Sequence, residues 1–200
     1  MIVHKAVTDY DDYIRRQGKK LIAFPDKFSA NNAKKIDSFA RIFKTNIITL
    51  NYPGNVLCLG ARAGWEVLGA KKAGFVGSVG IDLFPASEDV IQADWHHTPF
   101  GDSLFYNVYT NSIDHCCDLD KLIAESKRVL RPGGVFFLMI TQREDWKGQD
   151  TKTRLEKSNV EFLAWDNVSE FIPIFGSFGF KLIRSKSDGK WCYLFFKLEK

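Results

Sequence analysis

Residues 56–64 read VLCLGARAG, a short apolar run followed by a turn that contains Gly60 and Gly64. The apolar run is typical of a buried strand, and the segment 65–73 after the turn predicts a helix. Glycine has no side chain, so a ligand can approach the backbone of such a turn, and the N-terminus of the helix offers N–H groups to it. The stretch predicts a strand, turn and helix that either hold a ligand at the turn or form only a tight connection.

Short apolar runs and amphipathic segments keep alternating after this unit. The helical pattern of residues 119–130 is expected to end at the RPGG stretch of residues 131–134, because proline and glycine do not continue a helix. Such alternation is typical of a parallel sheet covered by helices on both faces. The further predicted strands are residues 75–83, 89–93, 104–110 and 135–141. The pattern therefore predicts a three-layer αβα, Rossmann-like sheet that is mostly parallel.

The end of the chain departs from the parallel pattern. Residues 180–185 and 191–198 are rich in apolar side chains and flank the turn sequence SDGK (187–190), so we expect an antiparallel hairpin. Before the hairpin, residues 168–178 predict a helix that Pro173 should kink or shorten. An antiparallel C-terminal strand distinguishes this sheet from the all-parallel nucleotide-binding folds.

The N-terminal part of the chain predicts helices rather than strands. Asp9 or Asp11 can cap a first helix, and Ser29 or Asn31 can cap a second helix with apolar residues at helical spacing. These helices form an extension that precedes the alternating core.

Length and composition fit one globular domain. Two hundred residues can bury roughly 70% of the surface that the unfolded chain exposes, and 45% hydrophobic with 26% charged residues is ordinary for a folded protein. The net charge of +4 is scattered among acidic residues, which is typical of a solvated surface and does not favour a nucleic-acid partner, though it leaves one open. We expect a single domain over residues 1–200, with a helical extension at 1–50 and the core at 55–200.

Cysteine and histidine usage indicates neither disulfides nor a metal centre. The four cysteines lie at positions 58, 116, 117 and 192 without CxxC or zinc-ligand spacing, so we expect reduced thiols in a cytoplasmic protein. His96 and His97 are neighbours but have no further ligands beside them, and we expect no metal. No run approaches 18 apolar residues, so we expect no membrane span.

Two acidic residues follow the second and third predicted strands. Asp82, with Leu83 beside it, can accept hydrogen bonds from both hydroxyls of a ribose bound across the strand ends; otherwise it is a helix cap or a surface acid. Asp94 can accept a hydrogen bond from an adenine amino group while Trp95 covers the ring; otherwise Asp94 caps a loop and Trp95 packs in the core. Together with the glycine turn, the two acids indicate an adenosyl-binding edge of the sheet.

Taken in order, these motifs resemble those of the class I S-adenosylmethionine-dependent methyltransferases, in the subgroup of the small type 11 enzymes. That family has a glycine-rich first motif, an acid after strands two and three, an FD-x-V-x fourth strand and an LRPGG turn, which correspond here to residues 59–64, Asp82, Asp94, 104–110 and 130–134. The resemblance covers residues 55–141 well and the hairpin loosely. It implies S-adenosylmethionine as cofactor, methyl transfer as the reaction, and donor contacts from Gly60, Ala61, Arg62 and Gly64.

The first motif departs from the family at two positions. The family carries an acid where this chain has Cys58, which cannot hold the ammonium group of the donor, and a glycine where this chain has Arg62. The site is therefore either modified or has lost its cofactor, and we favour a modified site. Arg62 either pairs with the methionine carboxylate of the donor or forms a surface pair with Glu66 one helical turn later.

The residues after the fourth strand are candidates for the methyl-transfer end. Asn111 and Ser112 resemble family residues that line this end of the pocket, and His115 is the candidate catalytic base, although a lone loop histidine is more often structural. Methyl transfer needs no base when donor and acceptor are held in line in a dry pocket, because the sulfonium is already activated.

The acceptor is constrained only by missing motifs. The fourth strand lacks the Asp/Asn-Pro-Pro-aromatic pattern of enzymes that methylate nucleobase amines and the Pro-Cys of those that methylate cytosine carbon. We expect a small-molecule, sugar or glycan acceptor beneath a lid made of the N-terminal helices and residues 142–159. The alternatives are a catalytically inactive domain that binds protein or RNA, and a nicotinamide-dependent oxidoreductase, which would need a GxGxxG turn that is absent here.

Overall fold

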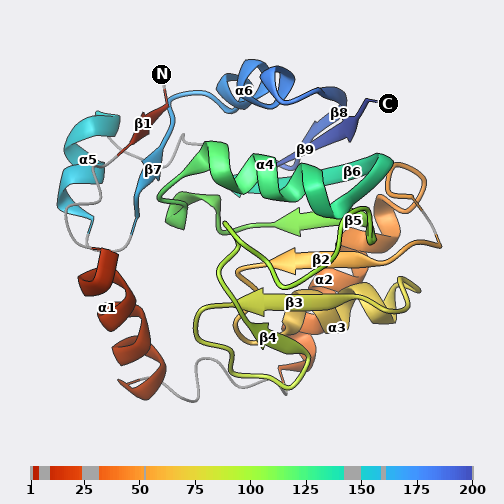
Figure 1. Ribbon diagram of the computed structural model, residues 1–200, viewed down its shortest axis with the longest axis horizontal. Coiled ribbons are helices and arrows are strands. Elements are labelled where there is room, and N and C mark those ends of the chain that lie inside the picture. Colours follow the sequence, from red (N-terminus) through yellow and green to blue (C-terminus); the bar gives the residue numbers. More distant parts are fainter. Residues whose placement is uncertain are drawn as a thin grey trace.

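The computed structural model describes residues 2–4, 10–23, 32–51, 53–141, 150–158 and 161–199. A seven-stranded sheet forms the centre of the fold, in the order β4-β3-β2-β5-β6-β9-β8 (Figure 1). Its strands are β2 (Val56–Leu59), β3 (Val79–Asp82), β4 (Val90–Gln92), β5 (Phe105–Thr110), β6 (Leu130–Thr141), β8 (Phe180–Ser187) and β9 (Trp191–Leu198).

The first five strands are parallel, and β9 runs antiparallel between β6 and β8. This order confirms the predicted mostly parallel sheet with an antiparallel C-terminal strand. A separate two-stranded antiparallel sheet joins β1 (Val3–His4) to β7 (Leu163–Ala164), and the sequence analysis did not predict it.

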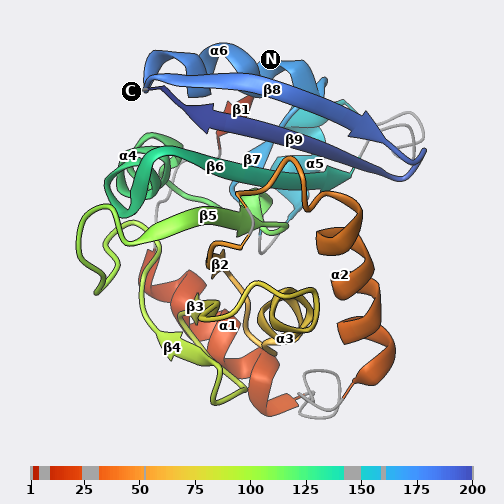
Figure 2. The ribbon, with the colours of Figure 1, turned by 90° about the vertical axis from the view of Figure 1, so that its right-hand side faces the viewer.

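Helices cover both faces of the large sheet (Figure 2). One face packs on α2 and α3 through Phe39, Phe43 and Val67, and the other packs on α4 and α6 through residues such as Leu122 and Phe175. The helices are α1 (Tyr10–Ala23), α2 (Ala33–Thr45), α3 (Trp65–Lys72), α4 (Leu119–Val129), α5 (Thr151–Lys157) and α6 (Phe171–Ser177), with short 3-10 helices η2 (Ile113–His115) and η4 (Val168–Glu170). The three-layer αβα prediction is confirmed.

Two local predictions need correction. The RPGG stretch of residues 131–134 does not form a turn before the strand, because β6 already begins at Leu130, which pairs with Phe105 before a bulge in the ladder. Gly133 takes φ +76 there, a conformation that other residues rarely adopt. The helix predicted at 168–178 is split into η4 and α6.

The predicted caps of the N-terminal helices also differ from the structure. Asn32 caps α2, since its side chain accepts a hydrogen bond from the Lys35 backbone N–H at 3.1 Å. Asp11 lies inside α1 rather than before it. The candidates Asp9, Ser29 and Asn31 lie outside the described residues.

The two N-terminal helices lie on different parts of the molecule. Helix α1 stands beside the arrowheads of the parallel strands, whereas α2 packs on α3 (Figures 1 and 2). A Cβ on Gly69 of α3 would lie only 2.5 Å from the Phe39 Cβ of α2, so glycine allows these two helices their close approach. Of the two N-terminal helices of the predicted lid, α1 is therefore the one that reaches the strand ends, whereas residues 142–149 and 159 of that lid lie outside the described residues.

A buried ion-pair network ties the loop after β4 to helix α4. The Glu125 carboxylate accepts hydrogen bonds from the Thr98 backbone N–H (2.8 Å), the Thr98 hydroxyl (2.6 Å) and the Arg128 guanidinium (2.8 and 2.6 Å). Arg128 also donates to the Phe100 carbonyl at 2.8 Å. The network holds in place the loop that carries Trp95.

We expect Glu125→Gln to lower the free energy of unfolding by about 2 kcal/mol at pH 7, the net worth of a hydrogen bond to a charged group. Burial acts to raise the pKa of Glu125, but hydrogen bonding from Arg128 and Thr98 outweighs this effect and lowers the pKa to about 2. A depressed folded-state pKa contributes stability above the unfolded value, near 4.5, that is lost as pH falls toward 2. Urea unfolding should therefore show the wild-type advantage shrinking below pH 4.5.

The exposed pair of Asp37 with Lys72 offers a control for this prediction. Asp37→Asn should leave the unfolding free energy nearly unchanged, because exposed pairs contribute little. A Glu125→Gln deficit that stays constant from pH 7 to pH 3 would contradict the assigned role of the carboxylate.

None of the helices in the described part of the chain has the length and hydropathy that a membrane span requires.

Candidate functional site

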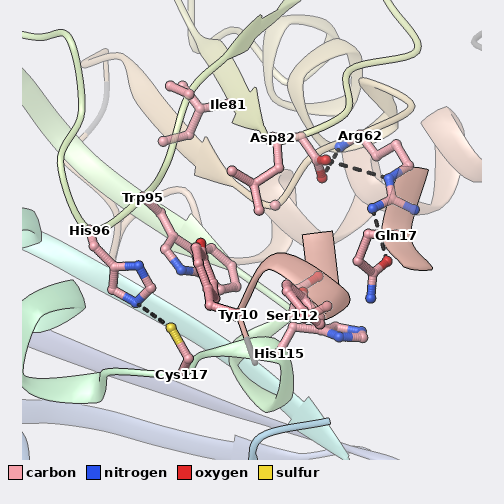
Figure 3. A pocket seen from close by; sticks show the side chains of 14 residues that line it. Tyr10, Gln17, Arg62, Ile81, Asp82, Trp95, His96, Ser112, His115 and Cys117 are labelled. Carbon is pink, nitrogen blue, oxygen red and sulfur yellow. Dashed lines mark hydrogen bonds and ion pairs between the residues drawn. The ribbon is translucent and has the colours of Figure 1, made fainter. Parts of the chain in front are cut away.

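A cavity of about 340 Å³ opens at the carboxyl edge of the parallel strands. Figure 3 shows side chains from the ends of β2, β3, β4 and β5 meeting those of α1 around it. The carboxyl ends of parallel strands carry the loops that bind ligands in open α/β sheets. Of the residues predicted from the sequence, Gly60, Arg62, Asp82, Leu83, Trp95, Ser112 and His115 line this cavity.

Four other predicted residues do not line the cavity: Ala61, Gly64, Asp94 and Asn111. Gly64 serves the turn instead, because it caps α3 at φ +75 and an added Cβ would lie 2.7 Å from the Ser87 hydroxyl. Asp94 and Asn111 are hydrogen-bonded to residues that do line the cavity, Tyr10 and Ser112. Asp94 and Asn111 therefore contact residues that line the cavity but do not line it themselves.

The glycine turn after β2 brings three chain segments together. Gly60 has φ +72, and a Cβ added to it would lie 3.1 Å both from the Trp95 ring and from the Ser112 Cβ. No larger residue fits this position, since the conformation and the two neighbours both exclude a side chain. The turn therefore lets the loops after β4 and β5 close around the same cavity.

Asp82 forms an ion pair with Arg62. Its Oδ1 accepts hydrogen bonds from the Phe84 backbone N–H (2.8 Å) and the Arg62 Nε (3.4 Å), and its Oδ2 accepts from the Arg62 backbone N–H (3.2 Å). Arg62 is thus held by Asp82 rather than by Glu66, the surface partner considered from the sequence. A carboxylate can accept about four hydrogen bonds, and three of these positions on Asp82 are occupied. One acceptor position therefore remains for a ligand, and a second becomes available if the ligand displaces the long contact with the Arg62 Nε.

Both carboxylate oxygens of Asp94 accept hydrogen bonds. Oδ1 accepts from the backbone N–H and Nδ1 of His96 at 2.8 and 2.7 Å, and Oδ2 accepts from the Tyr10 hydroxyl at 3.1 Å. Partial burial acts to raise the pKa of Asp94, but the hydrogen bonds from His96 outweigh this effect and lower the pKa. Burial likewise acts to lower the pKa of His96, but bonding to Asp94 and to two thiols raises it, so the pair is an ion pair at neutral pH.

The cysteines after β5 differ in their surroundings. The Cys116 Sγ and the Cys117 Sγ each lie 3.7 Å from the His96 Nε2. Cys116 is fully buried, whereas Cys117 is partly exposed and lines the cavity.

Helix α1, which belongs to the predicted lid, supplies a wall of the cavity, but its lining residues were not predicted from the sequence. Tyr10, Tyr13 and Gln17 lie at i, i+3 and i+7 and face the strand ends, a spacing that marks one side of a helix. Tyr13 packs edge-to-face on Phe162 at 4.6 Å between ring centroids. Burial raises the pKa of both tyrosines, so their hydroxyls stay protonated donors at neutral pH.

Gln17 carries a hydrogen-bond donor that no described residue accepts. Its side chain is only 3% exposed, its Oε1 accepts from the Arg62 Nη2 at 3.1 Å, and its Nε2 has no partner among the described residues. A buried unpaired donor costs free energy unless a ligand accepts from it. The amide and the adjacent guanidinium are both donors, an arrangement that suits a carboxylate group.

Comparison with known proteins agrees with this architecture. Residues 57–138 match the family described as Methyltransferase domain. None of the curated proteins matches the chain by sequence.

Solved structures share the fold across most of the chain. The 1,6-didemethyltoxoflavin-N1-methyltransferase of Burkholderia thailandensis, with bound 1,6-didemethyltoxoflavin and S-adenosylhomocysteine, superposes with a TM-score of 0.68 at 13% identity, over 98% of this chain and 92% of that one. An S-adenosylmethionine-dependent methyltransferase from Aquifex aeolicus gives 0.61 at 15% identity, over 85% and 98%. In the Haloferax volcanii complex that contains the Trm112 methyltransferase activator, the matching chain gives 0.64 at 15% identity, over 86% and 96%.

The sheet order, the antiparallel hairpin and the cavity at the strand ends are those of the Rossmann-like methyltransferase fold. Residues 57–138 carry a Methyltransferase domain, and S-adenosylmethionine is the methyl donor of this methyltransferase family. The resemblance drawn from the motifs is confirmed, and the oxidoreductase alternative is set aside.

Proposed function

We propose that this methyltransferase acts on a small-molecule acceptor, sugars and the sugar units of glycans included, bound with the donor beneath α1. The observation that carries the proposal is the size and cover of the cavity. At about 340 Å³ it lies near the lower end of the roughly 300–1,000 Å³ typical of ligand sites, and α1 walls it through Tyr10 and Gln17. Such a space suits a donor and a small acceptor better than a macromolecule.

A structural relative supports the pairing of a donor with a small acceptor. The Burkholderia thailandensis enzyme holds S-adenosylhomocysteine together with 1,6-didemethyltoxoflavin in the same fold. We infer by analogy that the acceptor of this chain enters the same cavity as the donor.

Within this proposal, the residues after β3 and β4 hold the adenosine. Asp82 accepts the ribose hydroxyls at its remaining acceptor positions, with Leu83 beside it, and the Gly60 turn with Ala61 lets the sugar approach the backbone. Trp95 covers the adenine ring. The adenine amino group takes the place of the Tyr10 hydroxyl on Asp94, the one contact of that carboxylate that comes from α1.

The opposite end of the cavity is assigned to the methionine portion and the acceptor. Gln17 Nε2 and Arg62 bind the methionine carboxylate, and Ser112 with Asn111 lies at the methyl-donor end. The donor supplies an activated methyl group on a sulfonium. The chain positions donor and acceptor and excludes water, and these two effects contribute much of the rate acceleration in methyl transfer. His115 is the candidate base for an acceptor that must lose a proton.

The first test of the function is a thermal shift with S-adenosylhomocysteine. At 100 times its dissociation constant a ligand stabilises the folded state by about 2.7 kcal/mol, which for 200 residues raises Tm by about 5–10 °C. NADH, as a matched control, should leave Tm unchanged. No shift with S-adenosylhomocysteine would favour the inactive, protein- or RNA-binding alternative.

The second arm of this test identifies the acceptor. The protein is incubated with isotopically labelled S-adenosylmethionine and a cell extract divided into small-molecule, glycan, protein and RNA fractions, and labelled products are found by mass spectrometry. Label in the small-molecule or glycan fraction supports the proposal. Label confined to the protein or RNA fraction would overturn it.

A further inference from the structure

Glu66 is a buried acid that the donor contacts above do not use. It lies in the first turn of α3, directly after the glycine turn, and is only 8% exposed. Its Oε1 accepts a hydrogen bond from the Asn111 Nδ2 at 3.3 Å, and the Asn111 Oδ1 accepts from the Ser112 hydroxyl at 3.1 Å. Because Ser112 lines the cavity, a chain of hydrogen bonds connects the buried carboxyl to the donor site.

Glu66 is an acid close to the position at which the first motif lacks one. Cys58 stands on β2 where related enzymes carry an acid, and burial raises the pKa of its thiol, so it is neutral. Glu66 lies close enough to Cys58 to act on its charge. The chain thus has a neutral group on the strand and a buried acid on the helix that follows.

We propose that Glu66 supplies the negative charge that holds the ammonium group of the donor, acting through Asn111. The inference rests on the proposed donor site. Because Glu66 binds the amide NH₂ of Asn111, the orientation of this amide is set, and its Oδ1 faces Ser112 on the cavity side. The donor ammonium then donates to the Ser112 hydroxyl oxygen at the cavity wall, this hydroxyl donates to the Asn111 Oδ1, and the Glu66 carboxylate behind Asn111 balances the charge, which makes Glu66 a positioning residue.

The surroundings of Glu66 make its charge respond to pH. Burial raises its pKa to about 7, against hydrogen bonds from its own backbone and Asn111 that lower it. The charged groups that act on Glu66 are Asp82 on β3, which raises its pKa, and Lys35 on α2, which lowers it. Glu66 in turn helps to raise the pKa values of Cys58 on β2 and Tyr109 on β5, which stay neutral. A bound ammonium favours the carboxylate, so binding near pH 7 should release a proton.

Calorimetric titration of the full chain with two ligands tests the assignment. S-Adenosylhomocysteine carries the ammonium group, whereas 5′-methylthioadenosine lacks the whole amino-acid portion. We expect Glu66→Gln, which keeps an acceptor for Asn111 but removes the charge, to weaken S-adenosylhomocysteine about tenfold and leave 5′-methylthioadenosine unchanged. The exposed Glu88 offers a matched control, since Glu88→Gln should change neither affinity.

The pH dependence gives a readout that a merely structural role would not move. A group of pKa about 7 goes from about one-tenth to nine-tenths ionised between pH 6 and pH 8, so wild-type affinity for S-adenosylhomocysteine should rise about tenfold relative to 5′-methylthioadenosine. Titration in buffers of different ionisation enthalpy should show the proton released. Glu66→Gln should abolish both effects, and Glu66→Asp should retain the pH dependence.

The outcomes separate the two proposals. If the wild type binds neither ligand, the donor site itself is wrong. If the wild type binds both, but Glu66→Gln binds S-adenosylhomocysteine equally well and the pH dependence persists, the assignment of Glu66 is overturned while the donor site stands.

Discussion

Replacing Asp82 by alanine is expected to weaken S-adenosylhomocysteine binding at least 100-fold. Two hydrogen bonds from ribose hydroxyls to a carboxylate are each worth about 1.5–3 kcal/mol, so their joint loss amounts to about 3 kcal/mol or more. The substitution also leaves Arg62, whose Nε and backbone N–H both bond to Asp82, without this partner. Calorimetric titration of the variant measures the effect directly.

A comparison with Arg62→Ala distinguishes the two ways in which Asp82 could act. If Asp82 binds the ribose, Asp82→Ala should weaken 5′-methylthioadenosine as well, because that ligand keeps the ribose. If Asp82 only holds Arg62, both variants should behave alike, with the loss limited to S-adenosylhomocysteine and its carboxylate. Unchanged affinity of Arg62→Ala for S-adenosylhomocysteine would eliminate the pairing of Arg62 with that carboxylate.

Phe137→Ala is expected to lower the free energy of unfolding by about 3–5 kcal/mol, the range for large aromatic truncations in a core. Phe137 is fully buried on β6 and stacks on Phe195 of β9 with centroids 4.4 Å apart and an interplanar angle of 14°. It also packs against Tyr109 at 5.0 Å and Phe43 at 6.2 Å. The ring therefore joins three strands and α2, and no single neighbour can move to fill the space.

Two further variants serve as controls for this prediction, and the unfolding free energies of all three variants are measured by urea unfolding. Phe137→Leu keeps most of the volume and should cost much less than the alanine variant. Ile48→Ala removes a side chain that is 96% exposed and should be near neutral. A Phe137→Ala cost as small as that of Ile48→Ala would mean that the aromatic cluster does not carry the stability assigned to it.

Much of the fold was predictable because its signals are local. The apolar run 56–59 coincides with β2, and the hairpin around residues 187–190 joins β8 and β9 as expected. The strands could be placed from period and turn residues alone. The RPGG stretch was misplaced since pairing of Leu130 with Phe105 on a neighbouring strand draws it into β6, and this pairing is not local.

The candidate site was predictable in part for the same reason. Gly60, Asp82, Trp95 and Ser112 follow parallel strands, and the carboxyl ends of such strands meet at one edge. Gln17 follows no strand, and no local signal indicates where α1 docks, although its spacing with the two tyrosines marks one face of a helix.

The sequence by itself determined the alternating strands and helices, the antiparallel ending and the edge of the sheet at which the cavity lies, because each follows from period, turn chemistry and the geometry of parallel strands. Only the tertiary structure decided that α1 rather than α2 walls the cavity, that Arg62 pairs with Asp82, and that Glu66 is buried and bonded to Asn111. These features depend on contacts between residues far apart in the chain, whose free energy is gained only when the layers pack together.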